Sequence, residues 1–367
     1  MLAVVEDNDL KIPEGYEWCK TSELLDGYKA CKFRLSPPTH GLVRSLMSDL
    51  PEKAHIPLND GGSHSSRFWR ALALDIEAEK WGARTHLEYA PSIECIPILS
   101  NTLFPFHATN LVTVLDGSDL MIVDPGSNDH GKAHLEAVLT RLQPATLHVF
   151  LTHHHHDHIQ SLDVVETLFP SAILIGHPYT LDKVNTPLLK RVVCSADSDE
   201  TYMVGSTALQ VLSLPGHTRG HLALYEPASK TLISGDHTVG FGSSVLDPDG
   251  GGNMASYLSS TERLLKLNIQ VILPCHGVPT LSNPLKLLQT YIDHRMEREK
   301  AIAQTWKSGI HSMDSLIRTV YTDTPEKMYL AAKRNVILHL EKLEDEGVIQ
   351  LTPEVEALVR AHRQSAL

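Results

Sequence analysis

The feature that most restricts this sequence is a run of four histidines, His153 to His156, followed at once by Asp157 and His158. The apolar residues 147–150 precede the run, and residues 159–169 follow it with the spacing of an amphipathic helix. A low-complexity polar tract would not be bracketed in this way. The pattern therefore predicts a strand, then a loop that presents metal-ligand groups, and then a helix.

Three further candidate ligands occur later in the chain. His217, Asp236 and His276 each come directly after an apolar run that is typical of a strand. Loops at strand ends are where a sheet can bring side chains from distant segments together. We therefore interpret the whole set as one metal site.

The types of side chain indicate the chemistry of this site. Neutral imidazoles and carboxylates suit zinc, and also manganese or iron, whereas structural zinc sites more often use cysteine. Seven ligands are too many for one tetrahedral ion but fit two ions about 3.5–4 Å apart that share a carboxylate. Such a pair activates water, so the expected reaction is hydrolysis.

The ligand motif resembles that of the metallo-β-lactamase superfamily, in its hydrolase branch with two metals. The resemblance covers about residues 100–280 and implies an α/β, four-layered αββα fold. It also implies two Zn²⁺ ions, with Mn²⁺ or iron as alternatives, and a hydroxide between them that Asp157 orients and can deprotonate. The implied ligands are His153, His155 and His217 for the first ion, Asp157, His158 and His276 for the second, and Asp236 for both.

The segments around the motif favour a layered sheet. Residues 111–115 and 120–124 predict a β-hairpin, and a helix at 132–142 precedes the strand at 147–151. A second helix at 159–169 and a strand at 172–175 follow. Asp124 ends the hairpin, and we expect it to hold the ligand loop by hydrogen bonds rather than to bind metal.

The remaining histidines near the motif are expected to play smaller parts. His154 and His156 should point away from the metal if their neighbours point in, and His177 is interpreted as structural. His221 and His237 are candidate contacts to substrate or to the ligands. The glycine-rich residues 240–253 are expected to form one wall of the site, without a phosphate-binding role.

Three domains are predicted: an N-terminal α/β appendage at 1–95, the hydrolase domain at 96–283 and a C-terminal unit at 284–367. The appendage, with expected helices at 39–49 and 65–80, resembles the degenerate Nudix-like segment of plant relatives. It lacks the glutamate-rich helix with which a working Nudix enzyme binds magnesium. We interpret it as a packing appendage, a relic or a platform that shapes the substrate site.

The C-terminal unit is expected to be winged-helix-like, with helices at 285–306, 312–321 and 325–343 and a short strand at 347–351. It resembles the C-terminal segment of the lactamase-like endoribonuclease of animal mitochondria. Residues 285–352 hold ten Lys/Arg and ten Asp/Glu, so they lack the basic excess of a duplex-binding module. We favour a lid on the hydrolase domain, with Lys333 and Arg334 as the basic pair to test, and expect no binding of duplex DNA.

Composition limits the class of protein. The chain has 42% hydrophobic and 21% charged residues, as soluble globular proteins do, and a net charge of -12 argues against a strongly basic nucleic-acid surface. Its five scattered cysteines are interpreted as reduced thiols. No apolar segment approaches about 18 residues, and no signal peptide is visible. We expect an intracellular, cytoplasmic protein without membrane contact, a mitochondrion or plastid being the alternative compartment.

The substrate is open between two classes. The resemblance over both the hydrolase domain and the C-terminal unit favours endonucleolytic cleavage of single-stranded RNA. The acidic net charge favours a thioester or small ester, as in glyoxalase-II-like enzymes. A true β-lactamase and a binding module with a vestigial site are less favoured, the second because all seven ligands are present.

Overall fold

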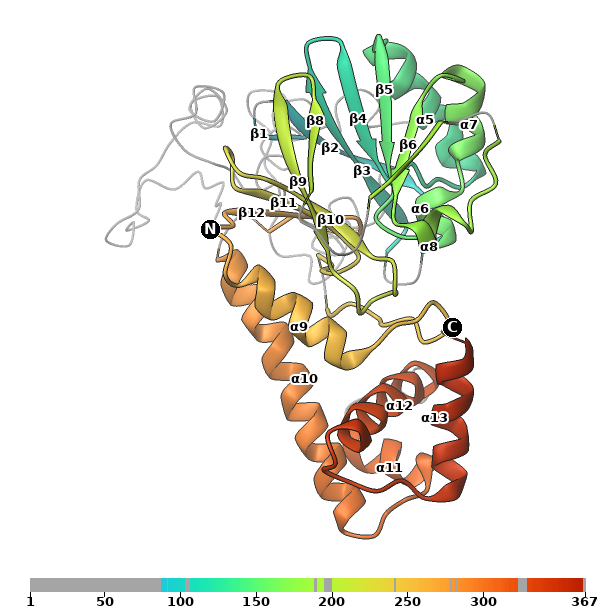
Figure 1. Ribbon diagram of the computed structural model, residues 1–367, viewed down its shortest axis with the longest axis vertical. Helices are drawn as coiled ribbons and strands as arrows, with labels where there is room; N and C mark the ends of the chain where they lie inside the picture. The colour runs from blue at the N-terminus through green and yellow to red at the C-terminus, as the bar shows by residue number, and fades with distance from the viewer. Residues whose placement is uncertain are drawn as a thin grey trace, which may run out of the picture. The chain divides into compact units, whose positions relative to one another are not determined.

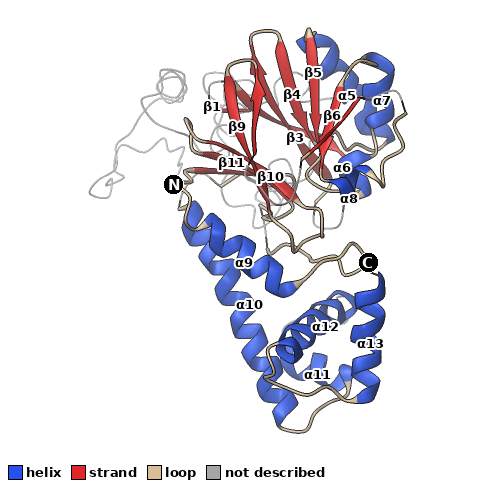
Figure 2. Ribbon diagram, viewed as in Figure 1, coloured by secondary structure: helices blue, strands red, loops and turns tan. Residues whose placement is uncertain are grey.

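The computed structural model describes residues 87–365, apart from 91, 103–105, 188–189, 195–199, 241, 278, 281–282 and 323–328. Residues 81–367 group into one compact unit. The described residues form two β-sheets and a set of helices around them (Figures 1 and 2). The N-terminal helices predicted at 39–49 and 65–80, and any Nudix-like segment, lie outside the described residues.

The first sheet has seven strands in chain order. Its first four strands are antiparallel, and β4 to β7 are parallel to one another. The parallel strands β4, β5 and β6 are apolar and buried, as expected for strands covered on both faces. The seven strands are β1 (Leu87–Ala90), β2 (Ile93–Leu99), β3 (Ala108–Asp116), β4 (Asp119–Val123), β5 (Thr146–Phe150), β6 (Ile173–Gly176) and β7 (Lys190–Val193).

The second sheet has five strands in the order β12-β11-β10-β9-β8. All are antiparallel except the parallel pair of β11 and β12, and β10 and β11 are buried along their whole length. They are β8 (Glu200–Val204), β9 (Thr207–Ser213), β10 (Leu222–Glu226), β11 (Thr231–Gly235) and β12 (Val271–Pro274).

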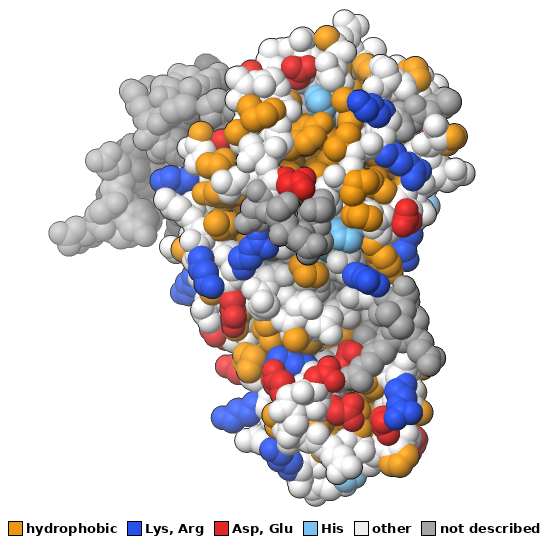
Figure 3. Space-filling model, in the orientation of Figure 1, with side chains coloured by type: hydrophobic (Ala, Val, Ile, Leu, Met, Phe, Trp, Pro, Cys, Tyr) orange, Lys and Arg blue, Asp and Glu red, His pale blue; other side chains and the backbone are white. Residues whose placement is uncertain are grey.

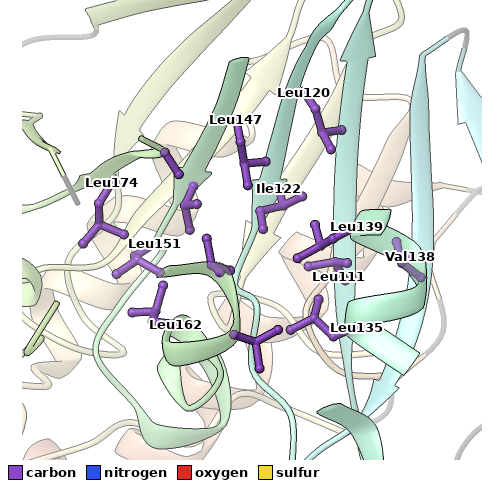
Figure 4. Close-up of a cluster of buried hydrophobic side chains, with 14 of the residues drawn as sticks. Leu111, Leu120, Ile122, Leu135, Val138, Leu139, Leu147, Leu151, Leu162 and Leu174 are labelled. Atoms are coloured by element: carbon purple, nitrogen blue, oxygen red, sulfur yellow. The ribbon is translucent and has the colours of Figure 1, made fainter. Parts of the chain in front are cut away.

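Helices cover the outer faces of both sheets, which gives four layers. Helices α5 (Asp129–Leu142) and α7 (Leu162–Leu168) pack on the first sheet, where Leu135, Val138 and Leu139 meet apolar side chains of β3 to β6 (Figure 4). A second core fills the space between the two sheets. A third core lies between the outer face of the second sheet and the helices α9 (Met254–Leu264) and α10 (Pro284–Lys307). The predicted αββα fold is confirmed.

The start of α5 shows how local sequence sets these elements. Asn128 caps the helix, because its side-chain oxygen accepts a hydrogen bond from the backbone N–H of Gly131 at 3.0 Å. Asp129 adds a negative charge at the positive end of the helix dipole. The helix therefore begins three residues before the predicted start at Lys132.

The described residues of the C-terminal part of the chain form four helices. Helix α10 contributes Ile302 and Trp306 to a separate apolar core. The other helices of this core are α11 (Met313–Val320), α12 (Tyr329–Asp345) and α13 (Pro353–Ser365). We call α11 to α13 the C-terminal helical unit. No helix among the described residues is both long and apolar enough to cross a membrane.

The short strand predicted at 347–351 is wrong, because these residues form a turn and an irregular segment (Figure 2). Gly347 has a φ of 69°, which ends α12, and the N–H of Val348 bonds back to the carbonyl of Leu343 at 2.9 Å. The carbonyl of Gln350 accepts the indole N–H of Trp306. Backbone groups that a strand needs for pairing are thus used elsewhere. Helix α13 was not predicted.

The two predicted domain boundaries fall at different kinds of position, one inside a strand and one at the start of a helix. The boundary between residues 95 and 96 lies inside β2, whose alternating burial already belongs to the first sheet. The boundary at 283/284 coincides with the start of α10. Helix α10 is shared, because its first half packs on the second sheet through Leu288 and its second half enters the C-terminal core.

A close approach at Gly126 generates the first prediction. A Cβ atom at this residue would lie 1.6 Å from the carbonyl oxygen of Asp157, so the turn after β4 tolerates no side chain. We expect Gly126→Ala to lower the free energy of unfolding by about 3 kcal/mol or more, measured by urea denaturation. The control is Gly117→Ala, with nothing within 4 Å and a φ of +62°, which should cost about 1–2 kcal/mol. Equal costs would contradict the prediction.

Candidate metal centre

The ligand loop leaves the first sheet at the end of β5. His153 is buried just after the strand, and the short helix α6 (His156–Ile159) follows with His155 as its N-cap. The sequence interpretation placed the start of a single helix at residue 159, but the N–H of His158 already bonds to the carbonyl of His155 at 3.0 Å. Asp157 in the first turn favours this start, because negative charge is stabilised at a helix N-terminus.

The structure brings all seven predicted ligands together in two adjoining groups. In the first, His153 Nε2 lies 2.8 Å from His155 Nδ1, and His217 Nε2 lies 3.2 Å from each of these atoms. In the second, His276 Nε2 lies 3.1 Å from His158 Nε2 and 3.2 Å from Asp157 Oδ2.

Asp236 lies between the two groups. Its Oδ2 is 3.8 Å from His217 Nε2 and 3.6 Å from His158 Nε2, and its Oδ1 is 3.4 Å from His276 Nε2. Oδ1 is buried and has no hydrogen-bond partner among the described residues. A buried carboxylate oxygen in this condition is costly unless it meets a cation.

Each of the five imidazoles holds its outer nitrogen against a hydrogen-bond acceptor. A ring that donates from its outer nitrogen keeps the lone pair of the inner nitrogen free for a metal ion. The partners are Thr152 Oγ1 for His153 (2.9 Å), Asp247 Oδ2 for His155 (2.8 Å), Asp124 Oδ2 for His158 (2.8 Å), Val245 O for His217 (2.5 Å) and Ala108 O for His276 (3.0 Å).

Asp124 accepts more of the hydrogen bonds around these ligands than any other of the acceptors just named. Its carboxylate is fully buried and accepts from the N–H and hydroxyl of Thr152 at 2.8 and 2.6 Å, from His158 Nδ1, and from the thiol of Cys275 at 3.0 Å. Asp124 has a φ of 53°, a strained value for a residue with a side chain. The expected role of Asp124 in holding the ligand loop by hydrogen bonds is confirmed.

Asp247 has a role that the sequence did not reveal. It belongs to the glycine-rich loop that was expected only to form a wall, yet it accepts a hydrogen bond from His155 Nε2. Its position in an acidic, proline-containing turn carries no signal that distinguishes it from Asp249. His154 also approaches Asp247 and His155, and its ring contacts Tyr179 at a centroid distance of 5.4 Å.

The other histidines singled out in the sequence either lie on the surface or form hydrogen bonds near the candidate ligands. His156 is exposed, as expected. His221 is buried and its Nε2 accepts the backbone N–H of Asp236 at 3.2 Å, so it supports a candidate ligand. His237 is hydrogen-bonded to Thr261 Oγ1 at 3.0 Å. His177 accepts a hydrogen bond from the N–H of Tyr179 at the start of α8 (Pro178–Leu181).

Burial and charge set the protonation of the cluster. Burial lowers the pKa of His153 well below its usual value and that of His217 to about 4, so both rings are neutral at pH 7. Burial acts in the same direction on His158 and His276, but the carboxylates of Asp236 and Asp157 outweigh it and raise the pKa of both rings. Two neutral imidazoles, together with carboxylates that attract positive charge to the other rings, suit a divalent cation.

Comparisons with known proteins agree with the architecture. Residues 105–276 match the metallo-beta-lactamase superfamily, and residues 312–354 match the beta-lactamase associated winged helix domain. A metallo-beta-lactamase family protein from Thermus thermophilus shares the fold, with a TM-score of 0.56 and 19% identity. That similarity covers 71% of this chain and 95% of the Thermus chain.

Two relatives differ in how much of the chain they match. The beta-lactamase-like protein 2 homolog of Caenorhabditis elegans is 30% identical over 253 residues, which span 67% of this chain and 82% of the relative. A hydroxyacylglutathione hydrolase of Bartonella tribocorum is 35% identical over 141 residues, 38% of this chain and 52% of that enzyme. The chain therefore belongs to the metallo-beta-lactamase superfamily of hydrolases and carries the winged-helix domain associated with that family.

Proposed function

We propose that this protein is a dinuclear metal hydrolase. The observation that carries the proposal is the direction of the five imidazoles, whose outer nitrogens are held by acceptors while their inner nitrogens converge. The proposed ligands are His153, His155 and His217 for one ion, Asp157, His158 and His276 for the other, and Asp236 for both. Two Zn²⁺ ions fit these nitrogen and oxygen donors, and Mn²⁺ or iron are alternatives.

The exposed fractions of the side chains show which side of the cluster is open to solvent. His155 is 28% exposed, Asp157 15% and Asp236 13%, whereas His158, His217 and His276 are 5% or less. Substrate therefore approaches from the side on which His155, Asp157 and Asp236 are exposed. The metal ions, when bound, lower the pKa of a water and polarise the substrate.

Asp157 is the group placed to orient the attacking water and to receive its proton. Burial opposes ionisation of this carboxyl, but His158 and His276 outweigh burial and lower its pKa. The Asp157 carboxylate is therefore ionised at pH 7 and can accept a hydrogen bond from the water. The oxygen of the water forms a new bond to the electrophilic atom, the bond to the leaving group breaks, and the proton passes to the leaving group.

We propose single-stranded RNA as the substrate. The support is the resemblance of both the hydrolase domain and the C-terminal unit to the lactamase-like endoribonuclease of animal mitochondria. The Caenorhabditis elegans relative matches 67% of this chain, whereas the Bartonella enzyme matches 38% of it. A thioester is the second candidate, because the Bartonella relative is a hydroxyacylglutathione hydrolase. On the face in Figure 3, lysine and arginine side chains are scattered rather than gathered into a basic groove.

The metal count is the most direct prediction. Protein reconstituted with zinc and freed of excess metal should retain two equivalents per chain, measured by inductively coupled plasma mass spectrometry. Asp236→Ala should retain less than one, because both ions lose a ligand and the remaining donors cannot hold two cations apart. Wild-type protein with less than one equivalent would contradict the proposal.

Asp124→Asn tests the supporting network. An amide offers one acceptor oxygen in place of two, so the hydrogen bonds to His158 and Thr152 cannot all remain. We expect zinc affinity to fall about 10–100-fold, measured by competition with a chromophoric chelator. The matched control is Asp116→Asn, a carboxylate at the β3–β4 turn that accepts from Ser206, which should leave zinc affinity unchanged. Equal losses in both variants would rule out a specific role for Asp124.

The substrate is tested with two assays on one preparation. Zinc-loaded protein should cleave a labelled single-stranded RNA, with activity that falls as salt rises. Asp236→Ala is the control for a contaminating nuclease and should be inactive. Hydrolysis of a glutathione thioester without RNA cleavage would replace the RNA proposal by the second candidate.

The same assays test whether the C-terminal helical unit holds RNA. Arg334 is paired with Asp249 of the glycine-rich loop at 3.0 Å, so Lys333→Glu is the cleaner charge reversal. Loss of RNA cleavage with intact metal content would assign the unit to RNA binding, and unchanged cleavage would leave it as a lid.

A further inference from the structure

The segment from Asp236 to Val245 contributes to the candidate metal centre at each of its two ends. Asp236 is a proposed ligand, and the carbonyl of Val245 accepts from His217 Nδ1 at 2.5 Å. Ser244 joins the two ends, because its hydroxyl donates to the carbonyl of Asp236 at 2.5 Å. Ser244 is 2% exposed. The position of the Ser244–Val245 peptide therefore sets how His217 and Asp236 face each other.

Helices α9 and α10 hold this segment from outside. The hydroxyl of Tyr257 on α9 donates to the carbonyl of His237 at 2.8 Å, and that of Tyr291 on α10 donates to the carbonyl of Val239 at 2.9 Å. Arg295 lies one turn after Tyr291, on the same face of the helix, and donates to the carbonyl of Ser244 at 2.5 Å. Three side chains from the two helices thus fix three carbonyls of one segment.

Arg295 also connects the segment to the C-terminal helical unit. Its second guanidinium nitrogen donates to Asn335 Oδ1 on α12 at 3.2 Å, and its guanidinium lies 5.0 Å from the centre of the Tyr257 ring. The side chain is buried, with 7% relative exposure. A planar guanidinium can hold a carbonyl, an amide and an aromatic ring at once, which an ammonium cannot do.

Apolar side chains also connect this segment to helices α9, α10 and α12. Leu246, next to Val245, lies in one cluster with Tyr257 and Tyr291 and with Leu338 of α12. The C-terminal helical unit therefore contacts the loop that supports His217, both through this cluster and through Arg295.

We propose that Arg295 is a positioning residue that couples the docking of the C-terminal helical unit to the geometry of the metal centre. It acts through the Ser244 carbonyl on the peptide that holds His217, and it does not touch substrate or metal. This inference rests on the proposed metal site and adds a role for the winged-helix region that does not require RNA.

The experiment compares two arginines on one helix. Arg298 lies three residues after Arg295, but it donates to the carbonyl of Val320 and lies 4.1 Å from the centre of the Tyr321 ring, within the C-terminal helical unit. Arg295→Met and Arg298→Met are prepared in the full-length protein. Zinc affinity is measured by chelator competition, and the visible absorption spectrum is recorded after substitution with Co²⁺.

Arg295→Met should bind zinc about 10–100-fold more weakly than wild-type protein, with an altered Co²⁺ spectrum. Arg295→Lys retains one donor for the Ser244 carbonyl and should recover part of the affinity. Arg298→Met should keep the wild-type affinity and spectrum even where its unfolding temperature falls. If Arg295→Met does not fold, Arg295→Lys and Asn335→Leu are compared with Arg298→Met in the same way.

Two outcomes would overturn the inference. The first is wild-type zinc affinity and Co²⁺ spectrum in the Arg295 variants, and the second is an equal loss in the Arg298 variant, which would mean that the helix acts only through stability. Both leave the proposed function intact. Wild-type protein that binds no metal would instead overturn the proposed function itself.

Discussion

The carboxylate of Asp124 is fully buried at the end of β4 and accepts hydrogen bonds from Thr152, His158 and Cys275, which come from two later segments of the chain. A buried charge without partners would cost several kcal/mol, so these donors are required wherever the carboxylate is buried. The same bonds fix the strand-end loops after β5 and β12. The candidate metal centre therefore depends on a carboxylate that is not one of its proposed ligands.

Convergence of the ligands follows from the two-sheet architecture. The loops after β5 and β12 carry His158 and His276, whose Nε2 atoms lie 3.1 Å apart. The loops meet because the apolar faces of both sheets share one core. Each loop then needs its own backbone or side-chain acceptors to turn the imidazoles inward. The acceptors Ala108, Thr152 and Val245 lie on different segments, so the site forms only when the sandwich is closed.

The C-terminal helical unit takes part in this arrangement from a distance. The buried face of helix α10 carries Leu288 onto the second sheet and Trp306 into the C-terminal core. Between them, Tyr291 and Arg295 bond to the carbonyls of Val239 and Ser244. The glycine-rich loop is held from both sides, by His155 at Asp247 and by Arg334 at Asp249. The helices after the second sheet therefore contact the loop that holds His155 and His217 in place.

The sequence by itself determined the alternating strands and helices of the first sheet and the set of candidate ligands, because hydrophobic periodicity and the spacing of histidines and aspartates are local properties of the chain. The αββα layers were implied by the resemblance to the metallo-β-lactamase superfamily. It also indicated the supporting role of Asp124, which ends a predicted strand. The roles of Asp247, Ser244 and Arg295 were decided only by the tertiary structure. So were the helical start at His156 and the irregular backbone at 347–351. Each of these depends on a partner that the local pattern does not name, such as Arg295 with Ser244, 51 positions earlier, and no local pattern specifies which distant groups will meet.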